Sequence, residues 1–381
     1  MKIISLQLKN HFLGWDFDEI KFSSNLTLLV GISGAGKTQI LRSIIDLKRI
    51  ANGKAINGLE WKIIFSTVNG TEFIWEGGFD TVETNELNFD NPEKDNQDEK
   101  EKPSFIYEKL ISKNEVLFER NKEQIKFKNS QMPKLSSHQS MIILLKEESV
   151  IKEAFDALNK IEYRDHTIKG VRFRSSKQSL HSLKNKYQTL ESIVNSDEDI
   201  RTKLYLTYEN KLDVFETIKS RLIDVFQQIE DVKVEPFKTD ELPKAIAANI
   251  FFPVISIKEK SVPKWIREDR MSSGMLRTII HLGEIFLSNE GSVILIDEFE
   301  NSLGINCIDI LTDDLIHENK TLQFIATSHH PYIINNIPYE YWKIVTRQGG
   351  HIRTCNASDY HLGKSKQDAF IQLNKILEKQ S

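Results

Sequence analysis

The segment from Gly31 to Thr38 constrains the fold of this chain more than any other stretch. It reads Gly-Ile-Ser-Gly-Ala-Gly-Lys-Thr, which has the spacing G-x-x-x-x-G-K-T. The apolar run Leu26 to Val30 before it predicts a buried strand, and Gln39 to Lys48 after it has apolar residues at helical spacing. A glycine loop between a strand and a helix is typical of a site that cradles phosphates. A chance glycine-rich turn before a lysine is the alternative, and it does not account for the flanking strand and helix.

The residue types in this loop fit a bound nucleotide. Glycines permit close approaches and backbone angles that a Cβ would prevent, so successive N–H groups can surround an anion. Lys37 is expected to place its charge on the β and γ phosphates, and the Thr38 hydroxyl to bind Mg²⁺. The helix N-terminus adds partial positive charge. We therefore predict ATP and Mg²⁺ as cofactors, with nucleotide contacts from Gly31, Ser33, Gly34, Ala35, Gly36, Lys37, Thr38 and Gln39.

Composition narrows the class of protein. A chain of 381 residues is expected to form one large interrupted domain or two domains. No apolar run approaches the roughly 18 residues of a membrane span, and the chain opens on a strand-like segment rather than a secretion signal. Cys307 and Cys355 lack metal-type spacing and suggest reduced thiols. The formal charge of −4 gives no overall attraction to nucleic acid. We expect a cytoplasmic protein with no membrane partner.

Several strands are expected around this loop. Asn69-Gly70 between two apolar-rich runs predicts a hairpin with a type I′ turn. The polar, acidic run from Thr84 to Lys102 predicts a solvated loop. Further strands are predicted at Lys2 to Lys9, Asp16 to Phe22, Phe105 to Ile111, Glu115 to Arg120, Glu123 to Phe127, Ile250 to Ile257, Tyr341 to Thr346 and His351 to Thr354.

The middle of the chain has a different pattern. From Ser140 to Leu158, and from Ser179 to Asp231, apolar residues recur every three or four positions, which predicts amphipathic helices long enough for an antiparallel arm or cap. Between them lies a basic patch that is either a solvated face or a contact for nucleic acid or phosphate. Its members are Lys160, Arg164, Lys169, Arg172, Arg174, Lys177, Lys184 and Lys186.

A second cluster of candidate residues follows two later strands. The apolar strand Val293 to Ile296 ends in Asp297 and Glu298, at the edge where open α/β sheets bind ligands. Asp297 is expected to hold Mg²⁺ through water, and Glu298 to orient and deprotonate the attacking water. His329, rather than His330, follows a strand predicted over Thr321 to Ala326 and is expected to sense the γ-phosphate; a purely structural histidine is the alternative.

Ser272-Ser273-Gly274 opens a helix predicted over Gly274 to Leu287. A serine hydroxyl and free N–H groups at a helix start form an anion site, or the serine serves only as an N-cap.

These motifs resemble the ABC-type ATPase heads of the SMC, DNA-repair and OLD-like families, and more closely the AAA-type ATPases of bacterial anti-phage systems such as Septu. The matching segments are Lys2 to Thr38, Met271 to Met275 for the signature loop, Val293 to Glu298 for Walker B, Glu300 to Leu303 for the D-loop, and Ser328 to Pro331 for the histidine switch.

The resemblance implies two ATP molecules between two head-to-tail subunits, with Ser272 and Gly274 acting on the partner's nucleotide. Ser273 and Met275 stand where transporters have Gly and Gln. Gln139 is the candidate for the Q-loop glutamine that binds Mg²⁺, and His11 or Phe12 for adenine stacking.

We therefore predict an α/β P-loop NTPase with an ABC-ATPase-like mixed sheet and an inserted helical arm. The expected parts are a head over 1–139 and 241–381 and a helical insertion over 140–240. The predicted function is an ATPase that forms a homodimer, or a higher homo-oligomer of dimers, and controls a separate effector in anti-phage defence. The resemblance implies a nuclease as the expected effector, and the chain itself shows no nuclease constellation. A DNA-repair or chromosome-maintenance head that binds duplex DNA, and a scaffold that binds ATP without hydrolysing it, are the alternatives.

Overall fold

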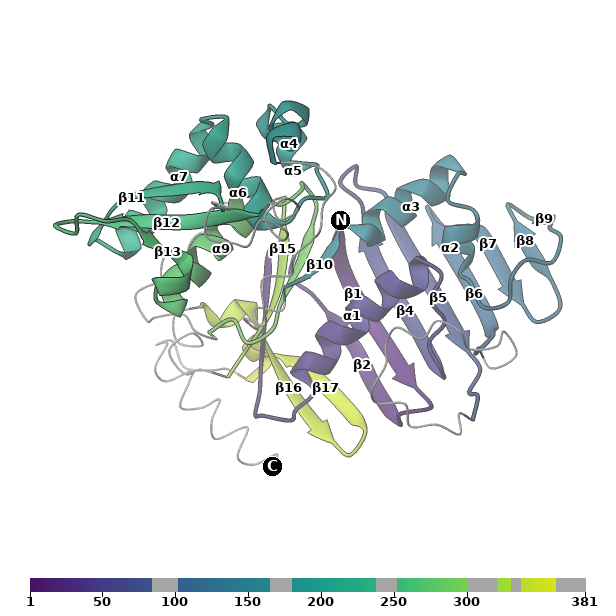
Figure 1. Ribbon diagram of the computed structural model, residues 1–381. Helices are drawn as coiled ribbons and strands as arrows, with labels where there is room; N and C mark the ends of the chain where they lie inside the picture. Colours follow the sequence, from purple (N-terminus) through teal and green to yellow (C-terminus); the bar gives the residue numbers. More distant parts are fainter. Residues whose placement is uncertain (84–101, 165–179, 238–251, 301–320, 330–336, 361–381) are drawn as a thin grey trace. The chain divides into compact units, whose positions relative to one another are not determined.

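The computed structural model describes residues 1–83, 102–164, 180–237, 252–300, 321–329 and 337–360 (Figure 1). The chain divides into two compact units. The first comprises residues 1–164, 290–299 and 320–381, and the second comprises residues 165–289 and 300–319. The first unit contains both the glycine loop and the acidic strand end, so the candidate nucleotide site can be described within it.

A fourteen-stranded mixed sheet organises the first unit. One end of the sheet is parallel, and each strand there pairs with its neighbour in the same direction. The order of these strands is β10 (Ile161–Arg164), β14 (Val293–Ile296), β15 (Gln323–Ser328), β3 (Leu26–Val30) and β16 (Trp342–Gln348). Strands β14, β15 and β3 are buried over their whole length and β16 over most of its length, as expected for strands in the interior of such a sheet.

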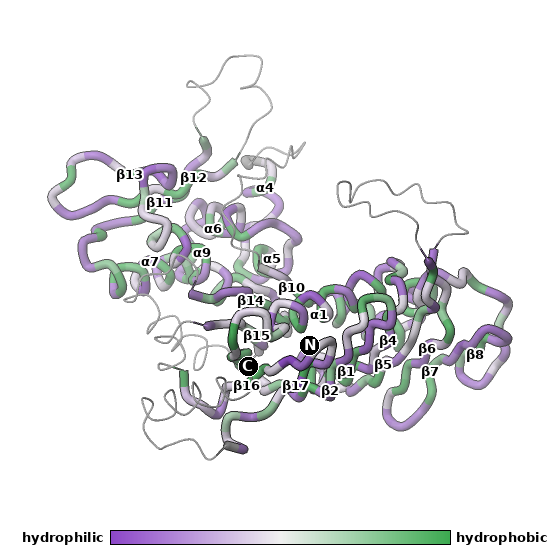
Figure 2. Tube along the Cα trace, turned by 90° about the horizontal axis from the view of Figure 1, so that it is seen from below, coloured by the Kyte–Doolittle hydropathy of each residue, from purple (hydrophilic) through white to green (hydrophobic). Residues whose placement is uncertain are grey.

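The rest of the sheet is largely antiparallel. After β16 come β17 (His351–Asn356), β2 (Trp15–Lys21), β1 (Lys2–Asn10), β4 (Leu59–Ser66), β5 (Glu72–Phe79), β6 (Phe105–Ser112), β7 (Glu115–Asn121), β8 (Ile125–Phe127) and β9 (Ser130–Gln131). Only the pairing of β17 with β2 is parallel. Hydrophobic and hydrophilic stretches alternate along β4 to β7 (Figure 2), as expected when one face of a sheet is covered.

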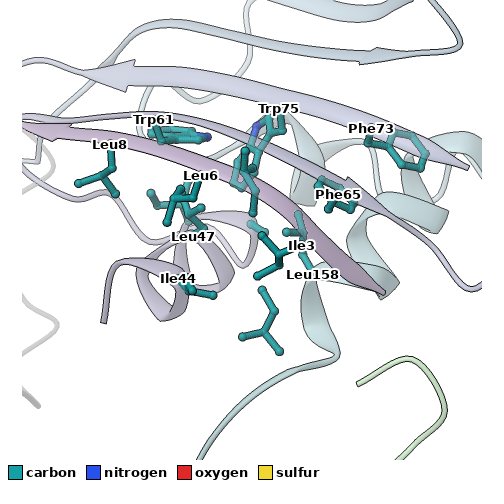
Figure 3. Packing of buried hydrophobic residues seen from close by; sticks show 14 of the residues in the cluster. Ile3, Leu6, Leu8, Ile44, Leu47, Trp61, Phe65, Phe73, Trp75 and Leu158 are labelled. Atoms are coloured by element: carbon teal, nitrogen blue, oxygen red, sulfur yellow. The ribbon is translucent and has the colours of Figure 1, made fainter. Parts of the chain in front are cut away.

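Helices α1 (Lys37–Ala51), α2 (Met141–Leu144) and α3 (Ser149–Asn159) belong to this unit and share its core. Figure 3 shows one layer of apolar side chains between helix and sheet, with Leu47 of α1, Leu6 of β1, Trp61 of β4 and Leu158 of α3 among them. The periodic apolar residues of α1 thus attach the helix that follows the glycine loop to β1, β4 and β5. This packing fixes the direction in which α1 leaves the loop.

The predicted hairpin is present between β4 and β5, but the predicted turn type is wrong. Gly70 has a positive φ of 80°, whereas Asn69 is not among the described residues with positive φ. The Gly70 N–H donates to the Thr67 carbonyl oxygen at 3.1 Å, and the Thr67 N–H donates to the Thr71 carbonyl oxygen at 2.9 Å. A type I′ turn needs positive φ at both central residues, so this is the three-residue loop that ends in a left-handed glycine.

The second unit contains helices and a small sheet. Its helices are α4 (Leu180–Lys186), α5 (Leu190–Val194), α6 (Ile200–Glu209), α7 (Asp213–Val225) and α9 (Ser273–Leu287). Strands β11 (Ile229–Pro236), β12 (Pro253–Glu259) and β13 (Ile266–Arg267) form its antiparallel sheet. Gly283 lets α9 approach α6 closely, because a Cβ there would lie 3.1 Å from Cγ1 of Ile200.

The prediction of long helices between Ser179 and Asp231 was wrong in two respects. Turns divide this segment into four helices, of which α7 is the longest with 13 residues, and Ile229 begins strand β11. The N-caps Thr189 and Asp199 accept hydrogen bonds from the first turns of α5 and α6 and so start new helices. The predicted C-terminal helix over Lys364 to Lys379 lies outside the described residues. In the described part of the chain, no helix has the length and apolar character needed to cross a membrane.

Candidate functional site

The glycine loop is held tightly between β3 and α1. Gly36, the N-cap of α1, has a positive φ of 99°, and a Cβ on it would lie 2.3 Å from Cδ1 of Ile352. A Cβ on Gly31 would lie 2.5 Å from the carbonyl oxygen of Val345. Both contacts come from the hairpin of β16 and β17, which packs against the loop. Gly36 is therefore required both by tertiary packing and by its backbone conformation, and Gly31 by tertiary packing.

The start of α1 fits a polyphosphate. The first N–H groups of a helix have no partner within the helix. Here the N-cap, Gly36, has no side chain that could cap them, and no acidic residue lies in the first turn. Lys37 lies at the same place, and its Nζ donates to the carbonyl oxygens of Gly31 at 2.7 Å and Ile32 at 3.0 Å. Free helix N–H groups together with a lysine form an anion site.

The strand order brings the other candidate residues to this loop. Strand β15 lies between β3 and β14 and is parallel to both, with Ser328 paired to Val30 and Ala326 paired to Ile296. Residues that follow these strands leave the sheet at the same edge. This register places His329 level with Gly31, and Asp297 level with Thr327.

Asp297 is fixed by three hydroxyl groups from three different elements. Thr38 donates to its Oδ1 at 3.1 Å, Thr327 donates to the same oxygen at 2.7 Å, and Tyr163 donates to Oδ2 at 3.4 Å. The structure thus joins Thr38 and Asp297, which lie 259 positions apart in the sequence.

This arrangement fits a magnesium ion. The Thr38 hydroxyl and the Asp297 carboxylate supply oxygen atoms side by side, and Mg²⁺ usually takes one or two such protein ligands together with phosphate oxygens and water. Within the described residues, no group of three or more His, Cys, Asp and Glu side chains could hold a metal ion. Thr38 and Asp297 leave the other coordination positions of such an ion to phosphate oxygens and water.

Glu298 has an unusual backbone conformation. Its φ is 48°, in the left-handed region that costs a non-glycine residue about 1–2 kcal/mol. The Glu298 N–H donates to Oγ1 of Thr327 at 2.8 Å, and its side chain is exposed. Because Thr327 also binds Asp297, one buried hydroxyl fixes both acidic residues. Strained residues of this kind concentrate at functional sites.

The histidine prediction is partly covered by the described residues. His329 is exposed and directly follows β15, at the edge where the glycine loop leaves β3. The strand itself runs two residues further than predicted, so Thr327 and Ser328 lie inside it. His330 and the rest of the histidine-switch segment lie outside the described residues. The role of His329 as a γ-phosphate sensor stays a prediction.

Gln139 does not lie at this site. Its Nε2 lies 3.4 Å from the position that a Cβ on Gly53 would take, and Gly53 follows the C-terminal end of α1. Since α1 runs from Lys37 to Ala51 with a rise of about 1.5 Å per residue, this end is about 20 Å from Thr38. The main-chain oxygen of Gln139 accepts a hydrogen bond from Arg120 at 2.7 Å, which helps to fix the segment there. The assignment of Gln139 as a metal ligand was therefore wrong.

The signature-loop residues Ser272 and Gly274 lie in the second unit. Ser272 is the N-cap of α9, and its Oγ accepts the Met275 N–H at 3.2 Å. Ser272 is thus an N-cap, which both interpretations of the sequence allow, and the action of Ser272 and Gly274 on a partner's nucleotide stays a prediction. Of the predicted D-loop, only Glu300 is described.

Other candidate residues have their own partners. The Nε2 of His11 lies 3.0 Å from the Glu60 carboxylate. In the basic patch, Lys160 donates to the main-chain oxygen of Glu290 and Lys184 forms an ion pair with Glu209, each at 2.8 Å. The patch residues Lys169, Arg172, Arg174 and Lys177, and the side chain of Arg164, lie outside the described residues.

Sequence reasoning missed two residues of this site. Thr327 is the polar residue next to the predicted end of β15, a signal that could have identified it. Tyr163 lies in β10, which pairs with β14 although 128 residues of sequence separate Arg164 from Val293. No local pattern predicts that pairing.

Comparisons with known proteins show the family of this chain. A family model described as "AAA domain, putative AbiEii toxin, Type IV TA system" matches residues 26–335, which is most of the chain and includes both the glycine loop and the acidic strand. The chain belongs to this AAA-domain family. Among curated protein sequences, none is significantly similar to it.

Solved structures that are similar to this chain include heads of SMC proteins. An SMC head bound to the C-winged helix domain of ScpA is similar with a TM-score of 0.51 and 13% identity, over 93% of this chain and 97% of that one. An SMC head with an extended coiled coil, bound to the C-terminal domain of ScpA derived from Pyrococcus furiosus, has 14% identity and a TM-score of 0.47 over 98% and 99% of the two chains. The SMC head of Thermotoga maritima has 12% identity and a TM-score of 0.40 over 93% and 99%. The first similarity and the family match confirm the predicted fold class, an α/β P-loop NTPase of the ATPase-head type.

Proposed function

We propose that this AAA-family chain binds and hydrolyses ATP with Mg²⁺. The observation that carries the proposal is the hydrogen bond between Thr38 and Asp297, which joins the end of the glycine loop to the acidic strand end. Glu298 follows Asp297 directly, and His329 leaves the same edge of the sheet. These are the groups that phosphate binding, metal binding and water activation require.

The described residues would divide the reaction between them. The N–H groups of α1 and the Lys37 ammonium would bind the phosphates, and Thr38 and Asp297 would hold the metal ion. Bound Mg²⁺ neutralises charge that develops on the phosphate oxygens. Glu298 would take a proton from the attacking water, and His329 would donate a hydrogen bond to the γ-phosphate.

We further propose that two copies close the site together. Glu298 and His329 are exposed, so a single copy leaves the reacting end of the nucleotide open to bulk water. Water exclusion strengthens the electrostatic interactions on which phosphoryl transfer depends. The exposed Ser272 at the start of α9 is the group that we expect the second copy to supply.

We propose that the ATPase controls a separate effector in bacterial anti-phage defence, as in Septu-type systems. The family description, with its toxin and Type IV toxin–antitoxin terms, supports a role in defence. The similar SMC head is bound to a winged-helix domain of another protein, which supports a partner for a head of this fold. A nuclease is the effector class that we expect.

The test is release of phosphate from ATP by wild type and Glu298→Gln. We expect hydrolysis to fall by at least about 100-fold in Glu298→Gln, because a positioned general base contributes about 10²–10⁴-fold, while ATP still binds. Glu290→Gln is the matched control, since this exposed glutamate precedes the amino end of the same strand β14. It should hydrolyse ATP like wild type.

Two outcomes would reject this function. Hydrolysis that is equal in wild type and Glu298→Gln would leave Glu298 without a role. Wild type that binds ATP but releases no phosphate would favour a nucleotide-locked scaffold. Salt-dependent binding of duplex DNA that disappears in Arg172→Ala/Arg174→Ala would favour the DNA-repair alternative instead.

A further inference from the structure

A pocket of about 310 Å³ lies beside the first half of the glycine loop. Ile32 to Ala35 line one part of it, and Val345 to Arg347 with Gly349, from the hairpin of β16 and β17, line the rest. The volume is at the small end of the range for ligand pockets, about 300–1,000 Å³. Lys37, Thr38 and Asp297 are not among its lining residues, whereas Ser33, Gly34 and Ala35 of the loop are, so the pocket adjoins the phosphate and metal groups.

Ile32 gives this pocket an exposed apolar side chain. It is 45% exposed. Covering apolar surface is favourable by about 25 cal/mol per Å². A planar, largely apolar group in the pocket would remove this surface from water.

Arg347 gives the same pocket an exposed but oriented guanidinium. Its Nε donates to the carbonyl oxygen of Gly349 at 2.6 Å, across the turn between β16 and β17. Holding Nε restricts the plane of the guanidinium while leaving the terminal nitrogens to other groups. A guanidinium in a fixed plane is suited to stacking on an aromatic ring.

The hairpin cannot move away from the loop without breaking close packing. The carbonyl oxygen of Val345 lies 2.5 Å from the position that a Cβ on Gly31 would take, and Ile352 lies against Gly36. At its turn, the Gly350 carbonyl oxygen accepts the Asp16 N–H at 3.0 Å. The pocket is therefore a built part of the loop's surroundings.

We propose that this pocket binds the nucleobase of the nucleotide, with Ile32 as its apolar wall and Arg347 stacked on the ring. This inference rests on the proposed ATPase function. It adds a binding site for the base, whereas the glycine loop binds the phosphates. The triphosphate would extend from the pocket along the loop to Lys37 and Thr38. Neither His11 nor Phe12, the adenine-stacking candidates of the sequence, is among the lining residues.

The experiment compares binding of ATP and of inorganic tripolyphosphate, by calorimetry with Mg²⁺, for wild type, Arg347→Ala and Arg347→Lys. Tripolyphosphate has the charges of ATP but no base. Arg353→Ala is the matched control. Arg353 lies on β17 and is exposed, and its Nε lies 3.5 Å from Oδ2 of Asp18. It is not among the residues that line the pocket.

We expect wild type to bind ATP more tightly than tripolyphosphate. Arg347→Ala should weaken ATP binding about three- to thirtyfold, the range of a cation–π contact, and leave tripolyphosphate binding within about twofold. Arg347→Lys should also weaken ATP binding, since lysine lacks the planar fork. Arg353→Ala should bind both ligands like wild type.

The other outcomes reject the nucleobase pocket. Equal losses for ATP and tripolyphosphate in Arg347→Ala would mean that Arg347 binds phosphate. Unchanged ATP binding, or full rescue by lysine, would exclude a stacked guanidinium. Wild type that binds neither ligand would instead reject the proposed ATPase function, and the pocket's assignment with it.

Discussion

Thr327 and Asp297 are hydrogen bonded, with Oγ1 of Thr327 donating to Oδ1 of Asp297 at 2.7 Å. The same Thr327 oxygen accepts the Glu298 N–H at 2.8 Å. Thr327 is 1% exposed, so water does not replace these bonds. A residue with no direct contact to the expected nucleotide therefore positions the two acidic groups that the proposed mechanism uses.

The first prediction concerns this hydroxyl. Thr327→Val keeps the side-chain shape and removes both hydrogen bonds, so the Mg²⁺ concentration that gives half-maximal hydrolysis should rise about 10–100-fold, as for other partners of metal ligands. The measurement is a Mg²⁺ titration of phosphate release. Thr327→Ser retains the hydroxyl and should restore the wild-type midpoint. A Thr327→Val enzyme with an unchanged midpoint would show that Thr327 has only a structural role.

A second prediction concerns Gly36. In Gly36→Ala, the added Cβ would lie 2.3 Å from Cδ1 of Ile352, and the residue would have to keep a φ of 99°. We therefore expect both loss of ATP binding and a lower free energy of unfolding. Gly70→Ala is the matched control, because Gly70 also has positive φ but has no heavy atom near a Cβ. It should lose about 1 kcal/mol of stability and bind ATP normally. Calorimetry and denaturant unfolding measure the two quantities; normal ATP binding by Gly36→Ala would contradict the packing argument.

The buried pair of Glu108 and Arg120 gives a prediction about stability. Glu108 is fully buried, lies 3.0 Å from Arg120, and accepts hydrogen bonds from Trp75 and from the Met141 N–H. Glu108→Ala leaves a buried guanidinium without its carboxylate and should destabilise the fold by about 3–5 kcal/mol. In the half-exposed pair of Lys126 and Glu119, Glu119→Ala should cost less than about 1 kcal/mol. The measurement is the free energy of unfolding of both variants in urea. Similar decreases in the two variants would contradict the role of burial.

A fourth prediction concerns pH. The pKa of Glu60 is lowered below its ordinary value of 4.5, mainly by its hydrogen bond with His11 and also by that from Tyr107, while burial opposes this effect. As pH falls, the Glu60 carboxylate is therefore protonated at a higher pH in the unfolded chain than in the native protein. The contribution of Glu60 to stability is complete above about pH 4.5 and is lost as pH falls through the lowered native pKa.

As pH falls through this acidic range, the free energy of unfolding should therefore decrease less in Glu60→Gln than in wild type. The measurement is the free energy of unfolding in urea at a series of pH values from neutral to acidic. Glu19→Gln, at an exposed position on β2, is the control and should follow the wild-type curve. Parallel curves for wild type and Glu60→Gln would contradict the prediction.

The fifth prediction tests closure of the site by a second copy. Ser272→Asp keeps an N-cap that is as favourable as serine for α9, but its charge would repel the phosphates of a facing nucleotide. In the Glu298→Gln background with ATP, we expect light scattering to show dimers that Ser272→Asp abolishes. Thr189→Asp, at the N-cap of α5, is the control and should dimerise normally. Equal dimer content in both variants would argue against Ser272 in the interface.

Local patterns predicted most of the elements that surround the site. The strand Leu26 to Val30, the strand Val293 to Ile296 and the helix from Gly274 were assigned from apolar periodicity, and the structure has them. The same periodicity misassigned Ile229, because a short apolar repeat does not show whether its residues pair with β12. The type of the turn at Gly70 was also missed, since its loop length is set by the pairing of β4 with β5.

By itself, the sequence determined the glycine loop, its lysine and threonine, and the acidic strand end, because each is a property of a few consecutive residues. The tertiary structure alone decided that β15 lies between β3 and β14, that Thr327 and Tyr163 bind Asp297, and that Gln139 lies at the far end of α1. Strand order and side-chain contact depend on the packing of the whole core. Thr327 and Tyr163 lie 30 and 134 positions from Asp297, and at such separations no local pattern shows which residues will become neighbours.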